Sequence, residues 1–164
     1  GRMMREKGIE ELLAAAEALH SEKTQFWLLG YPDEDYEEKL QKAEKEGCIR
    51  LLPFDPDVHG YLAKASALVL PSYHEGMSNV LLEAAATGRP VITSNIPGCR
   101  ESVENGKSGL LVEVKNKEML YQAMKKMLHC SREEREKMGK AGREKMKREF
   151  RKEAVVERTV RSLE

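Results

Sequence analysis

Two glutamates, Glu75 and Glu83, lie in the stretch PSYHEGMSNVLLE (71–83) with seven residues between them. Glu75 follows a short apolar run, and Glu83 lies about one turn inside a helix expected to begin near Asn79. The N-terminus of a helix presents free backbone N–H groups and binds phosphate well. A carboxylate one turn further along can accept hydrogen bonds from a ribose diol, and Glu75 can do the same for a second polyol such as a hexose.

The loop between the two acids is consistent with such a site, but the acids also have a purely structural explanation. Gly76 lets the backbone approach a ligand closely, and Ser78 or Asn79 can cap the helix. An acid near a helix N-terminus, however, stabilises the helix dipole by about 0.3–1 kcal/mol without any ligand. From the spacing alone this structural role is the simpler explanation, because strand–loop–helix turns are common in α/β proteins.

A second candidate group is the basic segment GRMMREKG at the start of the sequence. Arg2 and Lys7 precede a helix expected from Gly8 or Ile9, and both side chains can reach a phosphate, arginine as a planar fork and lysine as a point charge. Taken singly, each is better explained as part of a solvated basic loop. The phosphate interpretation gains weight if this segment and the helix start near Ser78 share one edge of a sheet.

Composition and motifs exclude several classes of protein. The 164 residues carry 28 basic and 28 acidic side chains, and this balance removes the usual electrostatic argument for nucleic-acid binding. The sequence contains no GxGxxG after a strand, no GxxxxGK[ST] and no GxSxG, which argues against dinucleotide, P-loop and serine-hydrolase sites. The four histidines are too scattered for a metal cluster, so no metal is expected.

The cysteines and the apolar runs bear on the compartment. Cys48, Cys99 and Cys130 are an odd number at wide spacings, which is typical of reduced thiols in a cytosolic protein. No apolar run approaches the roughly 20 residues of a membrane span, and no signal-peptide core is found in the sequence. We therefore expect a cytoplasmic protein.

Four further side chains invite a functional interpretation. His74 lies within the candidate loop, where a hydrogen-bonding or bystander role is expected rather than a metal-ligand role. Phe26 and Trp27 fall inside an apolar run and are predicted to be core residues. Phe54, just after its run, can flank a flat base, although a packing role explains it equally well.

These residues depend on an alternation of short apolar runs with longer amphipathic segments. The predicted strands are 24–30, 48–54, 67–73, 89–95 and 108–114, and the predicted helices are 9–20, 33–47, 57–65 and 79–88, followed by a loop with a short helix at 97–106 and a helical tail over 116–164. Alternation of this kind predicts one α/β domain over residues 1–164, a Rossmann-like parallel sheet with helices on both faces. Ligands bind at the carboxyl ends of such strands, where the candidate residues lie.

Four sequence blocks in this order resemble a known family: GRMMREKG, CIRLLPF, LPSYHEGMSNVLLEAAATGRPVI and IPGCRESVENGKSGLLV. The chain resembles the C-terminal, donor-binding half of the retaining family-4 (group 1) glycosyltransferases, which have the GT-B fold of two facing Rossmann-like domains. The likeness covers nearly the whole chain. Within the family, YHEGMSN is most similar to transferases that build bacterial surface polysaccharides, often on lipid-linked acceptors.

The resemblance implies a role for each matching position. Arg2 and Lys7 match the basic pair that binds the donor diphosphate, and Glu75 matches the acid that contacts the donor sugar near the reacting centre. Glu83 matches the acid that binds the ribose, and Phe54 belongs to the segment beside the base. The loop that holds sugar and phosphate is matched by Gly76, Met77, Ser78 and Asn79. Arg2, Lys7 and Glu75 are thus the expected catalytic residues, and Glu83, 76–79 and Phe54 the expected donor-binding residues. No cofactor and no metal are implied, because the donor, expected to be a UDP-sugar, is a substrate.

The resemblance also implies what this sequence lacks. The N-terminal domain with the acceptor site is absent, and so is the strand that normally precedes GR. That strand is central in a doubly wound sheet, so its loss should open the sheet or leave its place to a neighbouring chain, giving an oligomer. An isolated fragment is expected to be inactive. In the full-length enzyme, the resemblance implies a place in the cytoplasm, peripheral to the inner membrane face.

Other functions remain open at this point. A sugar-nucleotide epimerase of the same architecture would also bind a nucleotide sugar. A non-catalytic nucleotide-binding subunit would need a separate partner chain. A plain protein-interaction module leaves the polar loops at one sheet edge unexplained.

Overall fold

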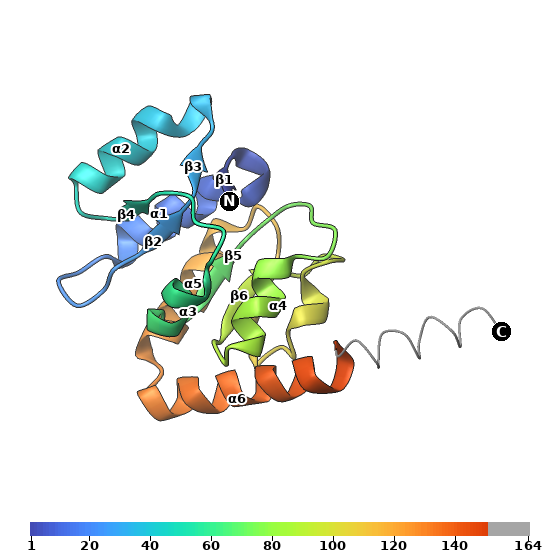
Figure 1. Ribbon diagram of the computed structural model, residues 1–164. Helices are drawn as coiled ribbons and strands as arrows, with labels where there is room; N and C mark the ends of the chain where they lie inside the picture. Colours follow the sequence, from blue (N-terminus) through green and yellow to red (C-terminus); the bar gives the residue numbers. More distant parts are fainter. Residues whose placement is uncertain (151–164) are drawn as a thin grey trace.

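The computed structural model describes residues 1–150, the side chain of Glu34 apart, so the last part of the predicted helical tail, 151–164, lies outside the described residues. The strands are β1 Arg2–Met3, β2 Trp27–Leu29, β3 Tyr31–Pro32, β4 Arg50–Leu52, β5 Leu68–Leu70, β6 Val91–Ser94 and β7 Gly109–Val112. The α-helices are α1 Ile9–Leu19, α2 Glu37–Lys45, α3 His59–Lys64, α4 Asn79–Ala86, α5 Lys117–His129 and α6 Arg132–Glu149, and three short 3₁₀ helices cover Arg5–Lys7, Glu34–Tyr36 and Arg100–Ser102. The predicted alternation is confirmed (Figure 1).

All strand pairs are parallel, but they form three separate ladders: β1 with β3, β2 with β4, and β5–β6–β7. Within residues 1–150, no ladder joins β2 to β5. The opened sheet expected from the sequence is therefore present. Its effect on burial is visible in β5, which is only half-buried along its length, whereas β6 beside it is buried throughout.

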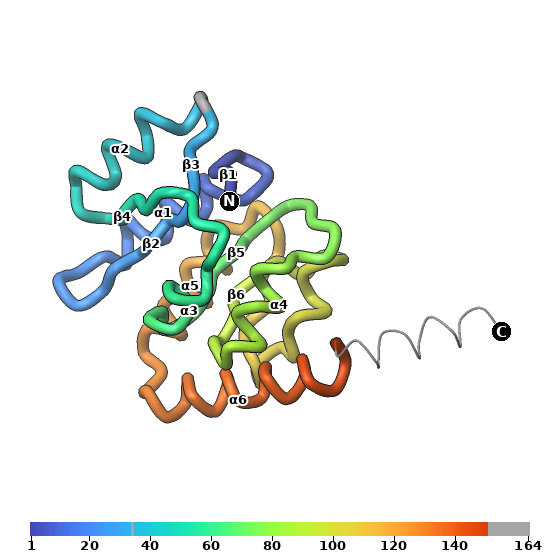
Figure 2. The backbone as a smooth tube through the Cα atoms, in the orientation of Figure 1, coloured from blue at the N-terminus to red at the C-terminus, as the bar shows by residue number. Residues whose placement is uncertain are grey.

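The start of the chain is itself a strand, which the sequence analysis did not predict. Arg2 pairs with Tyr31 and Met3 with Pro32. The amino group of Gly1 donates a hydrogen bond to the Leu29 carbonyl at 2.7 Å, so the segment enters beside the end of β2. Neither β1 nor β3 was predicted as a strand. Both are short strands because their backbone groups pair with each other, and local sequence does not reveal such pairing. The two segments run side by side in Figure 2.

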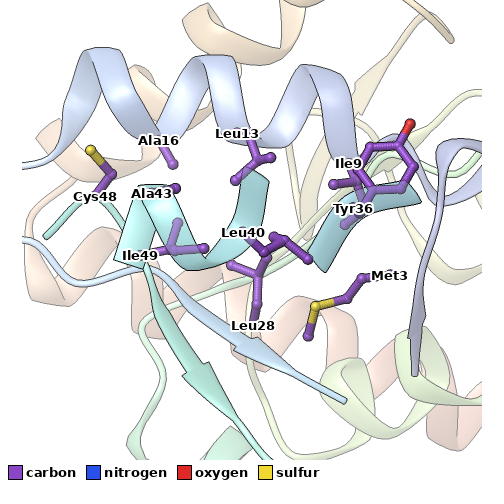
Figure 3. Close-up of a cluster of buried hydrophobic side chains, with 10 residues drawn as sticks. All are labelled: Met3, Ile9, Leu13, Ala16, Leu28, Tyr36, Leu40, Ala43, Cys48 and Ile49. Carbon is purple, nitrogen blue, oxygen red and sulfur yellow. The ribbon is translucent and has the colours of Figure 1, made fainter. Parts of the chain in front are cut away.

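One apolar cluster, the first cluster, lies between α1, α2 and the β2–β4 ladder (Figure 3). Its buried residues are Met3, Ile9, Leu13, Ala16, Leu28, Tyr36, Leu40, Ala43, Cys48 and Ile49. Because side chains alternate along a strand, Leu28 faces this cluster and Trp27 faces away. Trp27 remains 37% exposed, so the prediction that it is a core residue is wrong. Phe26, also predicted to be a core residue, is partly buried and packs against the first cluster.

Two more clusters cover the faces of the β5–β6–β7 ladder. The second cluster joins α1 and α5 to one face, and the third joins α3 and α4 to the other. Helices therefore lie on both faces, which confirms the Rossmann-like α/β prediction. Helix α6 packs across the C-terminal end of α4, where the backbones of Gly88, just after α4, and Gly139 approach too closely for a side chain at Gly139 (Figure 1).

Two observations concern the cysteines and the membrane. Cys48, Cys99 and Cys130 are all free thiols, and the first two are buried. Within residues 1–150, no helix combines the length and the apolar character needed to cross a membrane.

Candidate functional site

The loop after β5 and the segment from Arg2 to Gly8 come together at the carboxyl edge of the sheet. The Tyr73 N–H donates to the Glu6 carbonyl at 2.7 Å. Gly8 has φ +69°, and a Cβ at that position would collide with the Pro71 carbonyl oxygen. Glycine is therefore required at Gly8 both for its backbone conformation and for this close approach.

Glu75 and Lys7 form the centre of this junction. The Lys7 Nζ lies 2.6 Å from Glu75 Oε1, and the Ser72 Oγ donates to the same oxygen at 2.8 Å. The Glu75 side chain is 13% exposed and that of Lys7 33%. The structure thus brings one predicted cation and one predicted acid into direct contact, although they lie 68 positions apart.

A second contact of the loop after β5, between Tyr73 and Glu11, was not predicted from the sequence. The Tyr73 hydroxyl donates to Glu11 Oε2 at 2.8 Å, and Glu11 is only 6% exposed. Burial, followed by the hydrogen bond to the Glu11 carboxylate, raises the pKa of Tyr73 to about 12. An available signal was the presence of Glu11 among the apolar residues of the helix at 9–20, where an acid needs a partner.

The loop of Gly76 to Asn79 rests on the turn after β6. The Ser78 N–H donates to the Gly98 carbonyl at 3.1 Å, and the Gly98 N–H donates to Glu101 Oε2 at 2.8 Å. Gly98 has φ +85°, and a Cβ there would overlap the Gly76 carbonyl oxygen. Gly98 lies in the predicted loop 97–106, but the sequence gives no sign of this contact, which only the folded chain creates.

Gly98→Ala is expected to disturb this loop strongly. The backbone conformation alone costs about 1–2 kcal/mol for a non-glycine residue, and the overlap with Gly76 adds about 1–3 kcal/mol. Gly106→Ala is the matched control, because Gly106 has φ +77° and no atom within 4 Å of a built Cβ. Chemical denaturation should show a clearly larger loss for Gly98→Ala, and equal losses would contradict the close packing of Gly76 on Gly98.

Helix α4 begins at the end of this loop. Ser78 occupies the predicted N-cap position, but its hydroxyl makes no capping hydrogen bond. Among the described residues, the N–H groups of Asn79 and Val80 have no hydrogen-bond partner. Free N–H groups at a helix N-terminus attract an anion.

Glu83, in α4, differs from Glu75 in its hydrogen-bond partners. Its side chain is half-buried, and within residues 1–150 its carboxylate has no hydrogen bond or ion pair. Glu75 has two partners. The two acids of the motif are therefore not equivalent: one is held by the protein, and the other is available to a ligand.

The remaining predicted residues are exposed, and the contacts within residues 1–150 do not join them to Lys7 or Glu75. Arg2 is 55% exposed at its side chain and lies 4.0 Å from Asp33. Phe54 is 58% exposed and meets Tyr31 edge to face, with 6.2 Å between ring centres. Met77 is 50% exposed, and Gly76 and Asn79 are exposed as well. Because Tyr31 is the register partner of Arg2, the aromatic pair lies beside that cation.

Metal ligands form no group in the described part of the chain: no three His, Cys, Asp or Glu side chains come together there. His74 is exposed, and its role stays a prediction. The structure thus brings Lys7 and Glu75 together beside the loop that leads to the start of α4, while Arg2 and the Tyr31–Phe54 pair stay candidate members of the site. The fold and this edge define an α/β domain suited to a polyol ligand with an anionic group.

Comparison with known proteins gives the family. The family model described as "Glycosyl transferases group 1" matches residues 1–145. The chain therefore belongs to the group 1 glycosyltransferases, as the sequence resemblance indicated.

Individual proteins are similar to this chain in sequence or in fold. The lipopolysaccharide core biosynthesis glycosyltransferase LpsE of Rhizobium meliloti is 27% identical over 161 residues, which cover 96% of this chain and 46% of LpsE. Sucrose-phosphate synthase of Thermosynechococcus elongatus superimposes with a TM-score of 0.83 at 29% identity, over 99% of this chain and 44% of that one. HepE of Anabaena, in complex with UDP, has a TM-score of 0.83 at 18% identity, over 99% and 46%. The chain spans less than half the length of these proteins.

Proposed function

We propose that this chain is the donor-binding half of a retaining glycosyltransferase. It binds a nucleotide diphosphate sugar and presents the anomeric carbon to an acceptor hydroxyl. Transfer breaks the bond between that carbon and the diphosphate and forms a bond to the acceptor oxygen. The observation that carries the proposal is the meeting of Lys7, Glu75 and the start of α4 at one sheet edge.

The site residues divide the donor among them. Arg2, Lys7 and the N–H groups at the start of α4 hold the diphosphate and stabilise it as it departs. Two cations and a helix end provide this charge, so the scheme uses no metal and no cofactor. Glu83 accepts hydrogen bonds from the ribose, and its unpartnered carboxylate is suited to that role. Phe54 flanks the base.

Glu75 faces the sugar in this scheme. Its carboxylate lies beside the position of the anomeric carbon, where it can bind a sugar hydroxyl and stabilise positive charge that develops during transfer. The loop of Gly76, Met77, Ser78 and Asn79 supplies backbone groups to the sugar and the phosphate.

The nucleotide and the acceptor are inferred from the relatives, and the compartment from the cysteines. UDP is the first expectation, since HepE was solved with UDP. A surface polysaccharide is the expected product, since LpsE takes part in lipopolysaccharide core synthesis. The acceptor, a glycan or a lipid-linked sugar, binds to a second domain, and the open place between β2 and β5 receives a further strand. The free thiols suit a cytoplasmic enzyme, peripheral at the inner membrane face.

Isothermal calorimetry of the chain with UDP-sugars and GDP-sugars tests the proposal. We expect weak binding, with a Kd on the order of 0.1–1 mM because the chain spans less than half the length of its relatives and so provides only part of their contact surface, and no sugar transfer. Absence of binding by every nucleotide sugar would contradict the donor site. Turnover by the chain alone would contradict its role as one half of an enzyme.

A further inference from the structure

Ser72 occupies a special position in the site. It lies two residues after β5, is 0% exposed, and donates its hydroxyl to Glu75 Oε1. Lys7 bonds to the same oxygen. Within residues 1–150, Glu75 Oε2 has no partner. One oxygen of the carboxylate is therefore held by two protein donors, while the other is available.

We propose that Ser72 is a positioning residue, which fixes the Glu75 carboxylate so that Oε2 is directed at a hydroxyl of the donor sugar. The proposal rests on the proposed function. A terminal carboxylate torsion is broad, so Glu75 held by lysine alone can rotate with that flexible side chain. A second donor on a short side chain restricts the rotation.

The backbone around Ser72 is rigid enough for this task. Its neighbour Pro71 is in close contact with Gly8, and its other neighbour Tyr73 is held by the Glu6 carbonyl and, through its hydroxyl, by Glu11. The Ser72 hydroxyl is thus a fixed reference point for Glu75. Lys7 is different, because its ammonium group has three N–H donors. One of them bonds to Glu75, and the other two can bond to the diphosphate.

Separate roles follow for the two donors. Lys7 contributes to the binding of the nucleotide itself, since it touches the diphosphate. Ser72 contributes only to the part of the affinity that the sugar adds. The quantity to measure is therefore the sugar increment, the ratio of the Kd for UDP to the Kd for the tightest UDP-sugar among UDP-glucose, UDP-galactose and UDP-N-acetylglucosamine.

Ser72→Ala is expected to leave the Kd for UDP within about 2-fold of wild type and to reduce the sugar increment by about 3- to 10-fold, the effect of one hydrogen bond. Ser72→Thr, which keeps the hydroxyl, should restore part of the increment. Ser94→Ala is the matched control. Ser94 is the last residue of the neighbouring strand β6 and is as deeply buried as Ser72, but its hydroxyl has no hydrogen-bond partner in the described part of the chain. It should change neither constant.

The outcomes separate the two proposals. Three results would overturn the role of Ser72 but not the nucleotide site. The sugar increment could be unchanged in Ser72→Ala, Ser72→Ala could weaken the binding of UDP as much as that of the UDP-sugar, or the sugar could add no affinity in the wild type. A wild type that binds neither UDP nor any UDP-sugar would overturn the proposed function and this inference with it. If Ser72→Ala does not fold, Ser72→Cys, of similar size but a much weaker donor, gives the same comparison.

Discussion

Replacing Glu75 with glutamine in a full-length enzyme that carries this chain is expected to lower kcat on the order of 100-fold. The variant keeps the shape of the side chain but removes the negative charge that we propose lies beside the reacting carbon. It also breaks the ion pair with Lys7, whose Nζ lies 2.6 Å from the carboxylate. Steady-state kinetics with the nucleotide sugar should show a fall in kcat with a smaller change in KM, because the charge acts mainly on the transition state.

Glu133→Gln serves as the control for this variant. Glu133 is exposed in the first turn of α6, and its charge should not matter for transfer. If Glu75→Gln keeps nearly full kcat, Glu75 is a structural partner of Lys7 and Ser72 rather than a catalytic residue.

Glu83→Ala is expected to weaken UDP binding by about 10- to 100-fold, because hydrogen bonds to a charged group contribute about 1.5–3 kcal/mol. The free energy of unfolding without ligand should hardly change, since the carboxylate has no partner among residues 1–150. Calorimetry and chemical denaturation on the same samples measure the two quantities. A large loss of affinity at unchanged stability identifies a residue that serves the ligand and not the fold.

The control for Glu83 is Glu136→Ala. Glu136 pairs with Arg132 on the exposed side of α6, an ion pair of little energetic weight. Equal effects of the two substitutions on UDP binding would remove Glu83 from the site. A large loss of stability in Glu83→Ala would instead support the simpler explanation of a structural acid near a helix start.

Most of the fold could be predicted from the sequence, because its signals are local. Alternating apolar runs place the strands and helices, and the glycines after α2 and α4, Gly47 and Gly88, adopt the left-handed conformation expected of helix stops. Trp27 shows the limit of this reasoning. An apolar run predicts burial, but the side chain's face depends on the register and on the open sheet edge.

The candidate site divides in the same way. The motifs locate Lys7, Glu75 and Glu83 along the chain, but only the fold shows that the first two are paired and the third is not. The supporting contacts, Ser72 on Glu75 and Gly98 against Gly76, join segments whose meeting depends on the order of strands in space. Local patterns contain no signal for such contacts. The assigned roles of the site residues stay predictions until binding is measured.

The open place between β2 and β5 has a consequence for cooperativity. Among residues 1–150, Leu12 and Phe26 pack against both the first and the second cluster, and α1 supplies buried residues to both, so the lobe built on β2 and β4 is joined to the rest through α1 and Phe26 rather than through a strand ladder. Such a lobe opens locally at a lower free energy than the whole chain unfolds. If the donor is held as we propose, by Arg2 on that lobe and by the start of α4 on the other side, it binds only the closed form. Through mass action, each tenfold increase of nucleotide above its Kd would then add about 1.4 kcal/mol to the free energy of opening, so we expect the domain to become more rigid as the donor binds.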